Sequence, residues 1–524
     1  MNNYTISNVD IGIIIGYFCV VLVIGLIFSR KSDTGKDFFL AGRSLGWAAI
    51  GFSLFASNIS SPTLIGLSGQ AYRTGVSISN YEWMATLVLV FMTIFFIPFF
   101  IRSKITTIPE YLELRYDSFS RRYVSFFSIF LNVIVDTAAS LYAGALVLQL
   151  FFPNLVIWQT CFVIAFIAGI YTTAGGLKAV VFTDILQAVI ILVGSSILLF
   201  AVLGQFDYSW SKAVASIPQQ NMSVIQPMND ETLPWLGTLF GVPILGFYYW
   251  CTTQFISQRI LGARDLNNAR WGALLGAALK LPVLFLMVIP GVFAFSIFPD
   301  IAISDMVFAE MVIRLLPVGV VGIVLAGLIA AIMSSIDSGL NASSTLIVMD
   351  FIQPRRPELT KTQITKYGRI TTLILMVFAS LWAPFIANFD GIFQYLQQVL
   401  SFLVPPIATV FLLGGLWSRG NAHGAKATLI GGHSISMIAF ILFLNNYTFG
   451  LHFTVLAGIL TLISFCIYIV VSLNTVVPEM QNLNDLTWKY RLKETHISQP
   501  FYFDYRIISG VLVFLTFLLV ILFW

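Results

Sequence analysis

The stretch ASNISSPT, residues 56–63, interrupts an apolar segment that runs to Phe55 and resumes at Leu64. Proline removes an intrahelical hydrogen bond and clashes with the preceding turn, and small polar neighbours make unwinding easier. A second stretch, GVPILG at 241–246, interrupts another apolar segment in the same way. The sequence therefore predicts two broken helices.

The composition indicates a membrane protein. Of the 524 residues, 58% are hydrophobic and 10% are charged, and the mean hydropathy is +0.89, which excludes a soluble globular protein. An apolar helix of about 20 residues crosses the hydrocarbon layer, and the apolar runs lack the alternation of barrel strands. We predict fourteen membrane helices, at 10–29, 46–72, 80–103, 122–152, 156–174, 179–203, 236–258, 271–298, 316–350, 367–388, 392–416, 425–445, 451–474 and 504–524.

The basic residues test this map. With the N-terminus outside, the odd-numbered loops face the cytoplasm, and these loops with their flanks carry 24 of the 28 Lys and Arg residues. The outward segments carry three, namely Arg73, Lys212 and Arg314. This bias fits the positive-inside rule and predicts that both termini lie outside. The net charge of +4 then reflects topology, and we expect no nucleic-acid partner.

The two breaks head two blocks of five predicted helices, 46–203 and 236–416. Because five is odd, the second block enters from the opposite side of the membrane. This is the inverted-repeat arrangement of secondary transporters, whose sites lie at the broken helices near mid-membrane. We expect one all-α domain over 1–524, with peripheral helices at 10–29 and within 425–524. Two ordinary proline kinks are the alternative.

Five charged residues lie inside the predicted spans: Glu82, Asp136, Asp184, Lys280 and Asp337. A charge in hydrocarbon is costly, so such residues face a partner or a watery path. Glu82 and Lys280 have opposite signs and lie on the second helix of each block. A sugar hydroxyl can donate to a carboxylate and accept from an ammonium. A structural salt bridge is the alternative for this pair.

Oxygen atoms suited to Na+ gather in two places. The break in 46–72 frees carbonyls, which Ala56 and Ile59 offer on either side of it. The run 331–338 places Ala331, Ser334, Ser335 and Ser338 on one helix face. Small hydroxyl residues also permit close helix packing, but packing gives no reason for the carboxylate of Asp337.

Motifs for other chemistry are absent. The four cysteines have no paired or metal-ligand spacing, and the four histidines are scattered. The sequence also lacks the GxxxxGK[ST] phosphate loop. We therefore expect neither ATP use nor enzymatic activity.

Several runs, taken in order, resemble the sodium:solute symporter family and its sodium/sugar branch. The runs are ASNIS (56–60), YEWM (81–84), GGLKAVVFTDILQ (175–187), YYWCTTQ (248–254), ALKL (278–281), AAIMSSIDSGLN (330–341) and FQYLQ (393–397). The resemblance covers all fourteen predicted helices and implies a core of two inverted five-helix repeats of the leucine-transporter type.

The resemblance implies a site residue by residue. It assigns a Na+ site to Ala56, Ile59, Ala331, Ser334 and Ser335. It assigns substrate contacts to Glu82, Lys280, Gln397, Tyr249, Thr63, Asn58 and Ser60. It assigns an outer lid to Leu67, Tyr81 and Phe393, and an inner gate to Tyr249.

A second Na+ site is implied at Asp184, Ser334, Asp337 and Ser338. Like charges that lie close together repel unless a cation lies between them. Alternatively, Asp184 stabilises a helix start and pairs with a cytoplasmic cation such as Lys178.

Departures from the family pattern bear on the substrate. Thr63, Gly246 and Ala85 stand where galactose-type relatives carry glutamine, asparagine and serine, so polar contacts are shortened or lost. Sialic acid transporters use an arginine where this chain has Asp136, which would repel a carboxylate.

We predict a Na+-driven symporter that imports a neutral monosaccharide across a bacterial-type inner (plasma) membrane by alternating access. Alternative cargoes are myo-inositol, sialic acid and amino acids. A transporter-like sensor would carry a signalling domain, which we do not expect, and an ion channel would need no paired breaks.

Overall fold

Helices make up the regular structure of this chain in a computed structural model, which describes residues 7–29, 39–151, 154–389, 391–447, 450–490 and 504–524. Those residues form no β-strand and only two isolated bridges, Leu45 with Ala263 and Gln226 with Pro234. A long apolar sequence is expected to form helices in a membrane, because a helix satisfies the hydrogen bonds of its backbone N–H and C=O groups internally. The prediction of an all-α protein is confirmed.

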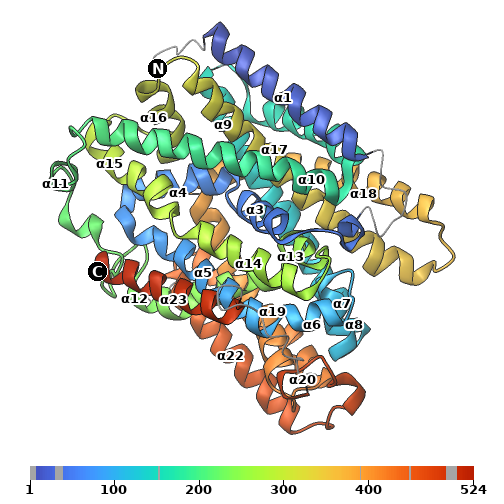
Figure 1. Cartoon of the computed structure of the whole chain (residues 1–524). Coiled ribbons are helices and arrows are strands. Elements are labelled where there is room, and N and C mark those ends of the chain that lie inside the picture. The colour runs from blue at the N-terminus through green and yellow to red at the C-terminus, as the bar shows by residue number, and fades with distance from the viewer. Residues whose placement is uncertain (1–6, 30–38, 152–153, 390, 448–449, 491–503) are drawn as a thin grey trace.

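The helices have the following bounds: α1 (Asn8–Ser29), α3 (Trp47–Asn58), α4 (Ser61–Thr74), α5 (Ser79–Phe95), α6 (Ile97–Arg102), α7 (Ile108–Arg115), α8 (Ser118–Phe130), α9 (Ala138–Phe151), α10 (Ile157–Gly204), α11 (Trp210–Ala215), α12 (Trp235–Phe247), α13 (Gln254–Leu261), α14 (Leu266–Lys280), α15 (Ile289–Ile297), α16 (Val307–Leu315), α17 (Val320–Leu346), α18 (Lys361–Trp382), α19 (Ile392–Leu416), α20 (Ala422–Ala427), α21 (His433–Leu444), α22 (Phe453–Leu473) and α23 (Tyr505–Leu522). Figure 1 shows their arrangement. Short π-helices continue several of them: η3 (Leu131–Thr137), η5 (Tyr248–Thr252), η6 (Leu284–Val288), η8 (Ile347–Ile352) and η11 (Thr428–Gly432).

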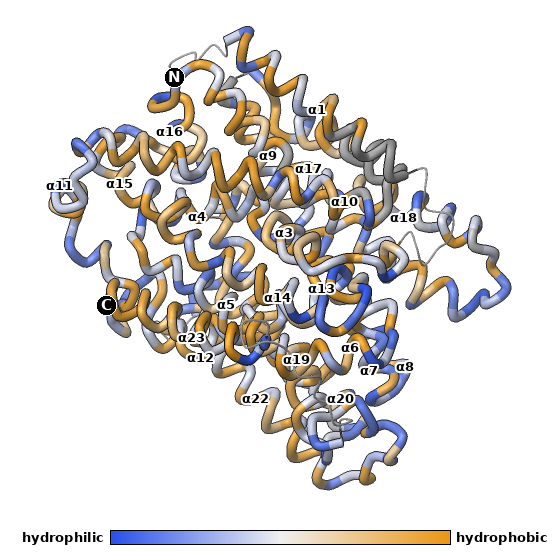
Figure 2. The backbone as a smooth tube through the Cα atoms, viewed as in Figure 1, coloured by the Kyte–Doolittle hydropathy of each residue, from blue (hydrophilic) through white to orange (hydrophobic). Residues whose placement is uncertain are grey.

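Ten helical segments of the described chain are long and apolar enough to cross a membrane, and two shorter apolar helices accompany them. Figure 2 shows apolar residues along the long helices and hydrophilic ones near α7, α8 and α13. The predicted spans 156–174 and 179–203 form a single helical segment, α10, of 48 residues. The connection between these spans contains no proline, so its backbone can remain helical. The number of fourteen spans stays a prediction.

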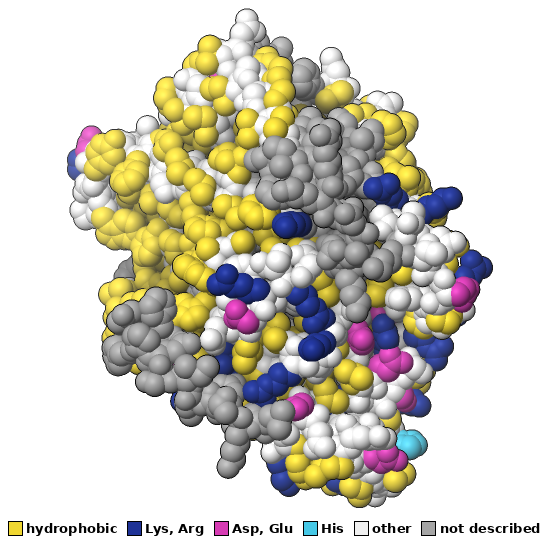
Figure 3. Space-filling model, turned by 45° about the vertical axis from the view of Figure 1, so that its right-hand side comes forward, with side chains coloured by type: hydrophobic (Ala, Val, Ile, Leu, Met, Phe, Trp, Pro, Cys, Tyr) yellow, Lys and Arg dark blue, Asp and Glu magenta, His cyan; other side chains and the backbone are white. Residues whose placement is uncertain are grey.

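Large apolar side chains cover much of the outer surface. Phe378, Ile438, Leu462 and Phe514 are each more than half exposed, on α18, α21, α22 and α23. Figure 3 shows Lys and Arg side chains gathered on part of the visible face, while much of the rest is apolar. A surface of this kind fits a lipid environment.

The predicted break at 56–63 is present. Helix α3 ends at Asn58 and α4 begins at Ser61, with Ile59 and Ser60 between them outside helical geometry. Pro62 lies in the first turn of α4, where its missing N–H costs nothing. The hydroxyl of Ser60 caps α4 by accepting from the N–H of Thr63 at 3.3 Å.

The predicted break at 241–246 is wrong in position. Pro243 lies inside the continuous helix α12, and the backbone leaves helical geometry later, at Thr253, after the π-helix η5. The glycine before Pro243 serves packing. A Cβ on Gly241 would lie 2.0 Å from the carbonyl oxygen of Thr454, so glycine lets α12 approach α22 closely.

The two chain ends pack against connections that the sequence places on the outside. The carbonyl of Phe523 accepts from the N–H of Val224, in the long connection after α10, at 2.8 Å. Asp10 in α1 accepts from the N–H groups of Gly319 and Gly322 at the start of α17, both at 2.7 Å. These contacts support the predicted location of the termini, which stays a prediction.

Candidate substrate and sodium site

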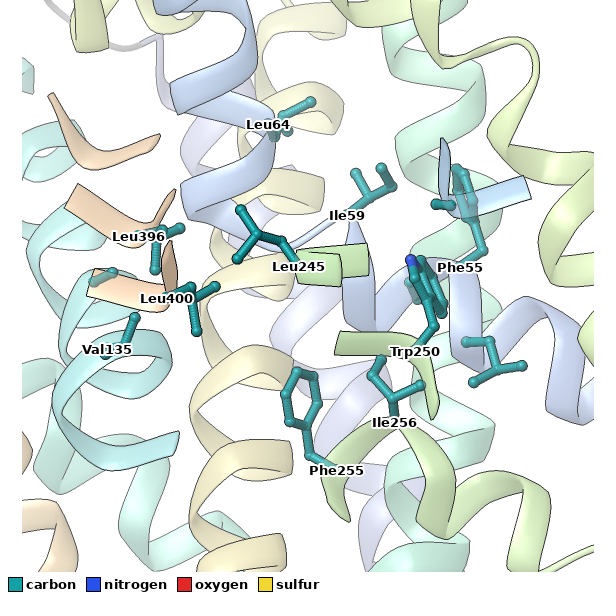
Figure 4. Close-up of a cluster of buried hydrophobic side chains, with 14 of the residues drawn as sticks. Phe55, Ile59, Leu64, Val135, Leu245, Trp250, Phe255, Ile256, Leu396 and Leu400 are labelled. Carbon is teal, nitrogen blue, oxygen red and sulfur yellow. The ribbon is translucent and has the colours of Figure 1, made fainter. Parts of the chain in front are cut away.

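A cavity lies where the break between α3 and α4 meets α5, η3, η5, α17 and α19. Its polar lining consists of Ser57, Asn58, Ser60, Thr63, Glu82, Asp136, Ser140, Tyr249, Ser335 and Gln397. Figure 4 shows part of its apolar wall, where Leu245 of α12 and Leu396 and Leu400 of α19 converge. A mostly apolar cavity with a few convergent polar groups is the usual form of a small-molecule site.

The break leaves two carbonyl groups without their helical donors. The N–H of Thr63, which a continuous helix would direct to Ile59, is bound to the hydroxyl of Ser60 instead. The carbonyl of Ala56 receives no hydrogen bond from the N–H of Ser60 in the described structure. The carbonyl of Asn58 is occupied, since it accepts from the hydroxyl of Thr63 at 2.8 Å. Ala56 and Ile59, the predicted ligands, therefore have carbonyl oxygens with free acceptor capacity.

Helix α17 brings the other predicted ligands to the same region, because it packs against both α3 and α4. The hydroxyl of Ser335 lines the cavity and donates to the carbonyl of Ala331 at 2.7 Å. The hydroxyl of Ser334 points elsewhere and donates to Asp184 at 2.5 Å. These oxygens suit a hard cation such as Na+. The described residues hold no cluster of His, Cys, Asp and Glu that fits another metal.

Asp184 is the centre of a dry polar network. Its carboxylate forms a salt bridge with Arg259 at 3.0 Å, and both side chains are buried. It also accepts from the hydroxyls of Ser53 at 2.5 Å and Ser57 at 3.3 Å. The cation beside Asp184 is thus Arg259 of α13, and the pairing with Lys178 is wrong. Burying two charges costs solvation free energy, so a buried ion pair is favourable only when further hydrogen bonds satisfy both groups, as they do here.

Arg259 also reaches the predicted second Na+ site. Its guanidinium donates to the hydroxyl of Ser338 at 2.8 Å and to that of Ser53 at 2.7 Å. It donates as well to the carbonyl of Phe255. Asp337, the remaining member of the predicted site, is buried one residue before Ser338. A guanidinium therefore lies where the sequence predicts a second metal ion.

Glu82 and Lys280 form a buried ion pair between α5 and α14. Glu82 lines the cavity, whereas Lys280 does not. The ammonium of Lys280 lies 5.5 Å from the ring centroid of Trp250, so one side of it is covered. The structure thus places the carboxylate at the cavity wall and the ammonium behind it.

The predicted gate residues lie on the cavity with one exception. Tyr81 and Phe393 meet edge to face with ring centroids 5.2 Å apart. Tyr249 packs edge to face on Phe255 at 5.4 Å. Leu67 is fully buried and is not part of the lining.

A model of the sodium:solute symporter family matches residues 38–432, which is most of the chain. The chain belongs to this family. Na+ is accordingly the coupling ion, and the protein is a membrane symporter.

Relatives of this symporter include sodium/glucose cotransporter 4 of Danio rerio, which is 32% identical over 93% of this chain and 81% of the relative. Sodium/myo-inositol cotransporter 2 of Homo sapiens is 35% identical over 83% of this chain and 70% of the relative. Sodium/glucose cotransporter 1 of Oryctolagus cuniculus is 34% identical over 92% of this chain and 81% of the relative.

Solved structures support the fold of the symporter. A substrate-bound, outward-open Na+-coupled sialic acid symporter aligns with a TM-score of 0.77 at 22% identity, over 90% of this chain and 99% of that one. A nucleobase-cation-symport-1 family transporter in a closed conformation aligns with a TM-score of 0.52 at 13% identity, over 86% of this chain and 98% of that one.

Sequence reasoning missed one feature of this symporter's site, the part that Arg259 plays in it. Arg259 belongs to a predicted cytoplasmic loop, and only its position directly after the predicted span 236–258 distinguishes it from the other basic residues there. Asp136, which the resemblance marks as an acid that would repel a substrate carboxylate, lies in the cavity wall. The three departures from the family pattern, at Thr63, Ala85 and Gly246, all line the cavity.

Proposed function

We propose that this symporter imports a neutral sugar, most simply a monosaccharide, together with Na+. A cavity carries this proposal. It is bordered by the break between α3 and α4, where carbonyl groups lack helical donors, by the hydroxyl of Ser335, and by a polar wall that contains Glu82 and Gln397. A sugar ring offers hydroxyls that donate and accept in several directions. The sodium/glucose relatives support a monosaccharide.

The second candidate cargo is a cyclic polyol such as myo-inositol. Its hydroxyls have the same chemistry, and a sodium/myo-inositol cotransporter is as similar to this chain as the glucose cotransporters are. Sialic acid is disfavoured, because its carboxylate would face Asp136 and Glu82 in the cavity wall.

The first Na+ would be held by the carbonyls of Ala56, Ile59 and Ala331 and the hydroxyls of Ser334 and Ser335. An ion shared by the break and α17 ties the broken helix to α17, which stabilises the outward-open state. Sugar binding then brings Tyr81 and Phe393 together with Leu67 behind them. Inward opening moves Tyr249 aside and separates the Na+ ligands, so both solutes leave.

A second Na+ beside Asp184, Ser334, Asp337 and Ser338 would compete with Arg259. Both cations need the same carboxylate, and the guanidinium holds it in this conformation. We infer that the second ion binds only in states in which Arg259 has left Asp184. Release of Na+ would then let Arg259 return, which resets the inner side of the site.

The wider assignments belong to the same proposal. The repeats comprise 46–203 and 236–416 within one transporter domain, both termini lie outside, and the protein resides in a bacterial-type plasma membrane. The membrane potential contributes about 2.3 kcal/mol per charge per 100 mV, which makes Na+ an effective driving ion.

Uptake into proteoliposomes tests the function. An inward Na+ gradient imposed on vesicles with the purified chain should accumulate a labelled hexose or myo-inositol, and an equal K+ gradient should not. Competition with a panel of sugars, inositol, sialic acid and amino acids ranks the cargoes. If only amino acids or sialic acid are accumulated, the polyol proposal is wrong.

A further inference from the structure

Asp136 lies in the wall of the proposed substrate cavity, on the π-helix η3. A π-turn inserts one residue into a helix and turns its side chains, and such turns are frequent at functional sites. Ser140, one turn further on, lines the same cavity, and its hydroxyl donates to the backbone carbonyl of Asp136 at 2.9 Å. The backbone carbonyl of Asp136 is thus occupied, and the residue remains partly exposed in the cavity wall.

The charges of the cavity wall do not balance. Glu82 and Asp136 are the two charged residues in its lining. Glu82 is neutralised from behind by Lys280. Asp136 has no salt bridge, and its carboxylate receives no hydrogen bond within the described part of the chain. The other buried cation nearby, Arg259, is already held by Asp184.

The same wall also has an excess of hydrogen-bond acceptors. The side-chain oxygen Oδ1 of Asn58 is buried and has no partner among the described residues, and Asn58 lines the cavity at 8% exposure. Asp136 is partly buried and Asn58 is buried, and acceptors without donors are costly where they are shielded from water. A ligand group that only donates satisfies both. A protonated amine is such a group, with N–H donors, no acceptor, and the positive charge that Asp136 lacks.

We propose that Asp136 is the charge-selecting residue of this site, and that polyols carrying a protonated amino group, such as amino sugars, bind there in preference to their neutral and acidic analogues. This inference rests on the proposed polyol transport and replaces the neutral sugar of that proposal with a cationic one as the preferred substrate. The hydroxyls of the ligand meet Glu82 and Gln397, as in a neutral sugar. The ammonium meets Asp136 and the acceptor oxygen of Asn58.

A matched series of competitors tests the proposal on the purified full chain in proteoliposomes. Na+-driven uptake of a labelled hexose is inhibited with four compounds: the hexose, its 2-amino-2-deoxy form, the N-acetyl derivative of that amine, and the corresponding uronic acid. A hydrogen bond between charged groups in a buried site corresponds to roughly tenfold or more in affinity. The amino sugar should therefore inhibit at about one tenth of the hexose concentration. The N-acetyl form should lose this advantage, and the uronic acid should be the weakest.

Asp136→Asn keeps the shape and removes the charge. In this variant the amino sugar and the hexose should inhibit at equal concentrations, and the uronic acid should gain. Asp207→Asn, which neutralises an exposed acid in the long outer connection, should leave the order of the four compounds unchanged. If Asp136→Asn does not fold, the order in the unaltered protein, measured by uptake and by thermal stabilisation of the purified chain, decides the matter.

Three results would overturn the inference. In the first, hexose and amino sugar inhibit equally in the unaltered protein. In the second, the order is the same in Asp136→Asn. In the third, Asp136→Asn changes the Na+ dependence of uptake but not the order, which assigns the carboxylate to a metal ion. If no polyol of the series is accumulated or bound, the proposed function itself is wrong. This outcome differs from the three above, in which polyols are still transported.

Discussion

The guanidinium of Arg259 donates to the carboxylate of Asp184 at 3.0 Å, and neither side chain is exposed to solvent. Arg259 lies on α13, after the irregular end of α12, while Asp184 belongs to α10. The pair therefore ties α13 to α10 through a buried contact. It also takes the carboxylate that a second Na+ would need.

Removing the arginine should make a second Na+ bind more easily. In Arg259→Gln the competing cation is gone, so we expect the Na+ concentration for half-maximal uptake to fall several-fold. In Asp184→Asn the ion loses its carboxylate, and the Hill coefficient for Na+ should fall from near two toward one. Both are measured as initial uptake rates across a Na+ series in proteoliposomes.

The matched control is Arg121→Gln. Arg121 forms the same kind of ion pair, with Asp350 at 2.6 Å, away from the cavity, and its removal should leave the Na+ dependence unchanged. A ratio of one charge moved per sugar in the unaltered protein would contradict a second Na+. Asp184 and Arg259 would then only hold α10 and α13 together.

The first Na+ site is tested on α17. Ser335→Ala removes a hydroxyl oxygen that lines the cavity. A Na+ ion with few ligands would find no other oxygen to replace it. We expect the Na+ concentration for half-maximal uptake to rise roughly tenfold, by analogy with lost charge-assisted hydrogen bonds. Ser343→Ala is the control, because Ser343 is a buried serine on the same helix and its hydroxyl has no partner in the described structure. Equal Na+ dependence in the two variants would remove Ser335 from the site.

The two predicted breaks show what the sequence can and cannot specify. At 56–63 the proline follows a capping serine, and these local features alone end one helix and start the next. At 241–246 the same residue types lie within a continuous helix, because their role depends on a distant segment. Gly241 is required by the backbone of Thr454, more than 200 positions away. A local pattern cannot distinguish a glycine that permits unwinding from one that permits packing.

At the site, as at the two breaks, the sequence predicts local features but not contacts between distant residues. Free carbonyls at Ala56 and Ile59 follow from local helix rules, since a break always leaves acceptors without donors. The partners of buried charges do not follow from local rules. Arg259 pairs with Asp184 across 75 positions, and Lys280 lies behind Glu82 rather than beside it in the wall. Only the packing of α5, α13 and α14 decides which member of a pair faces the cavity.

Single and double variants of the Glu82–Lys280 pair distinguish a role in substrate binding from a purely structural role. Glu82→Ala and Lys280→Ala should each abolish uptake, because either change leaves a lone buried charge, at a cost of about 3–5 kcal/mol. If the pair only holds α5 against α14, Glu82→Ala/Lys280→Ala should restore uptake. We expect the double variant to fold, as judged by its thermal unfolding midpoint, but to remain inactive, since Glu82 lines the proposed substrate cavity. Recovery of uptake in that variant would remove both residues from the substrate site.

Asp305 makes the packing beside the predicted outer lid dependent on pH. It lies between α15 and α17, outside the membrane-spanning segments, and its carboxylate accepts from the N–H of Ile392 at 2.9 Å, next to Phe393 of the lid. Burial raises the pKa of Asp305 above its ordinary 3.8, although the bond from Ile392 and the charge of Arg73 oppose the rise. The packed state therefore binds a proton more readily than the unfolded one. Its stability falls as the pH rises from 3.8 through the raised value.

Acidification should accordingly stabilise the packed arrangement of Asp305 and Ile392 beside Phe393. Asp305→Asn keeps an oxygen for the N–H of Ile392 and removes the titration, so its thermal unfolding midpoint should not show the acid-side rise of the unaltered protein. The measurement is the difference in midpoint between the two proteins across the acid range, together with access of a thiol reagent to a cysteine placed at Phe393. Asp207→Asn, which changes an exposed acid in the connection after α10, serves as control and should follow the unaltered protein. Identical pH profiles for Asp305→Asn and the unaltered protein would show that this carboxylate does not govern the lid.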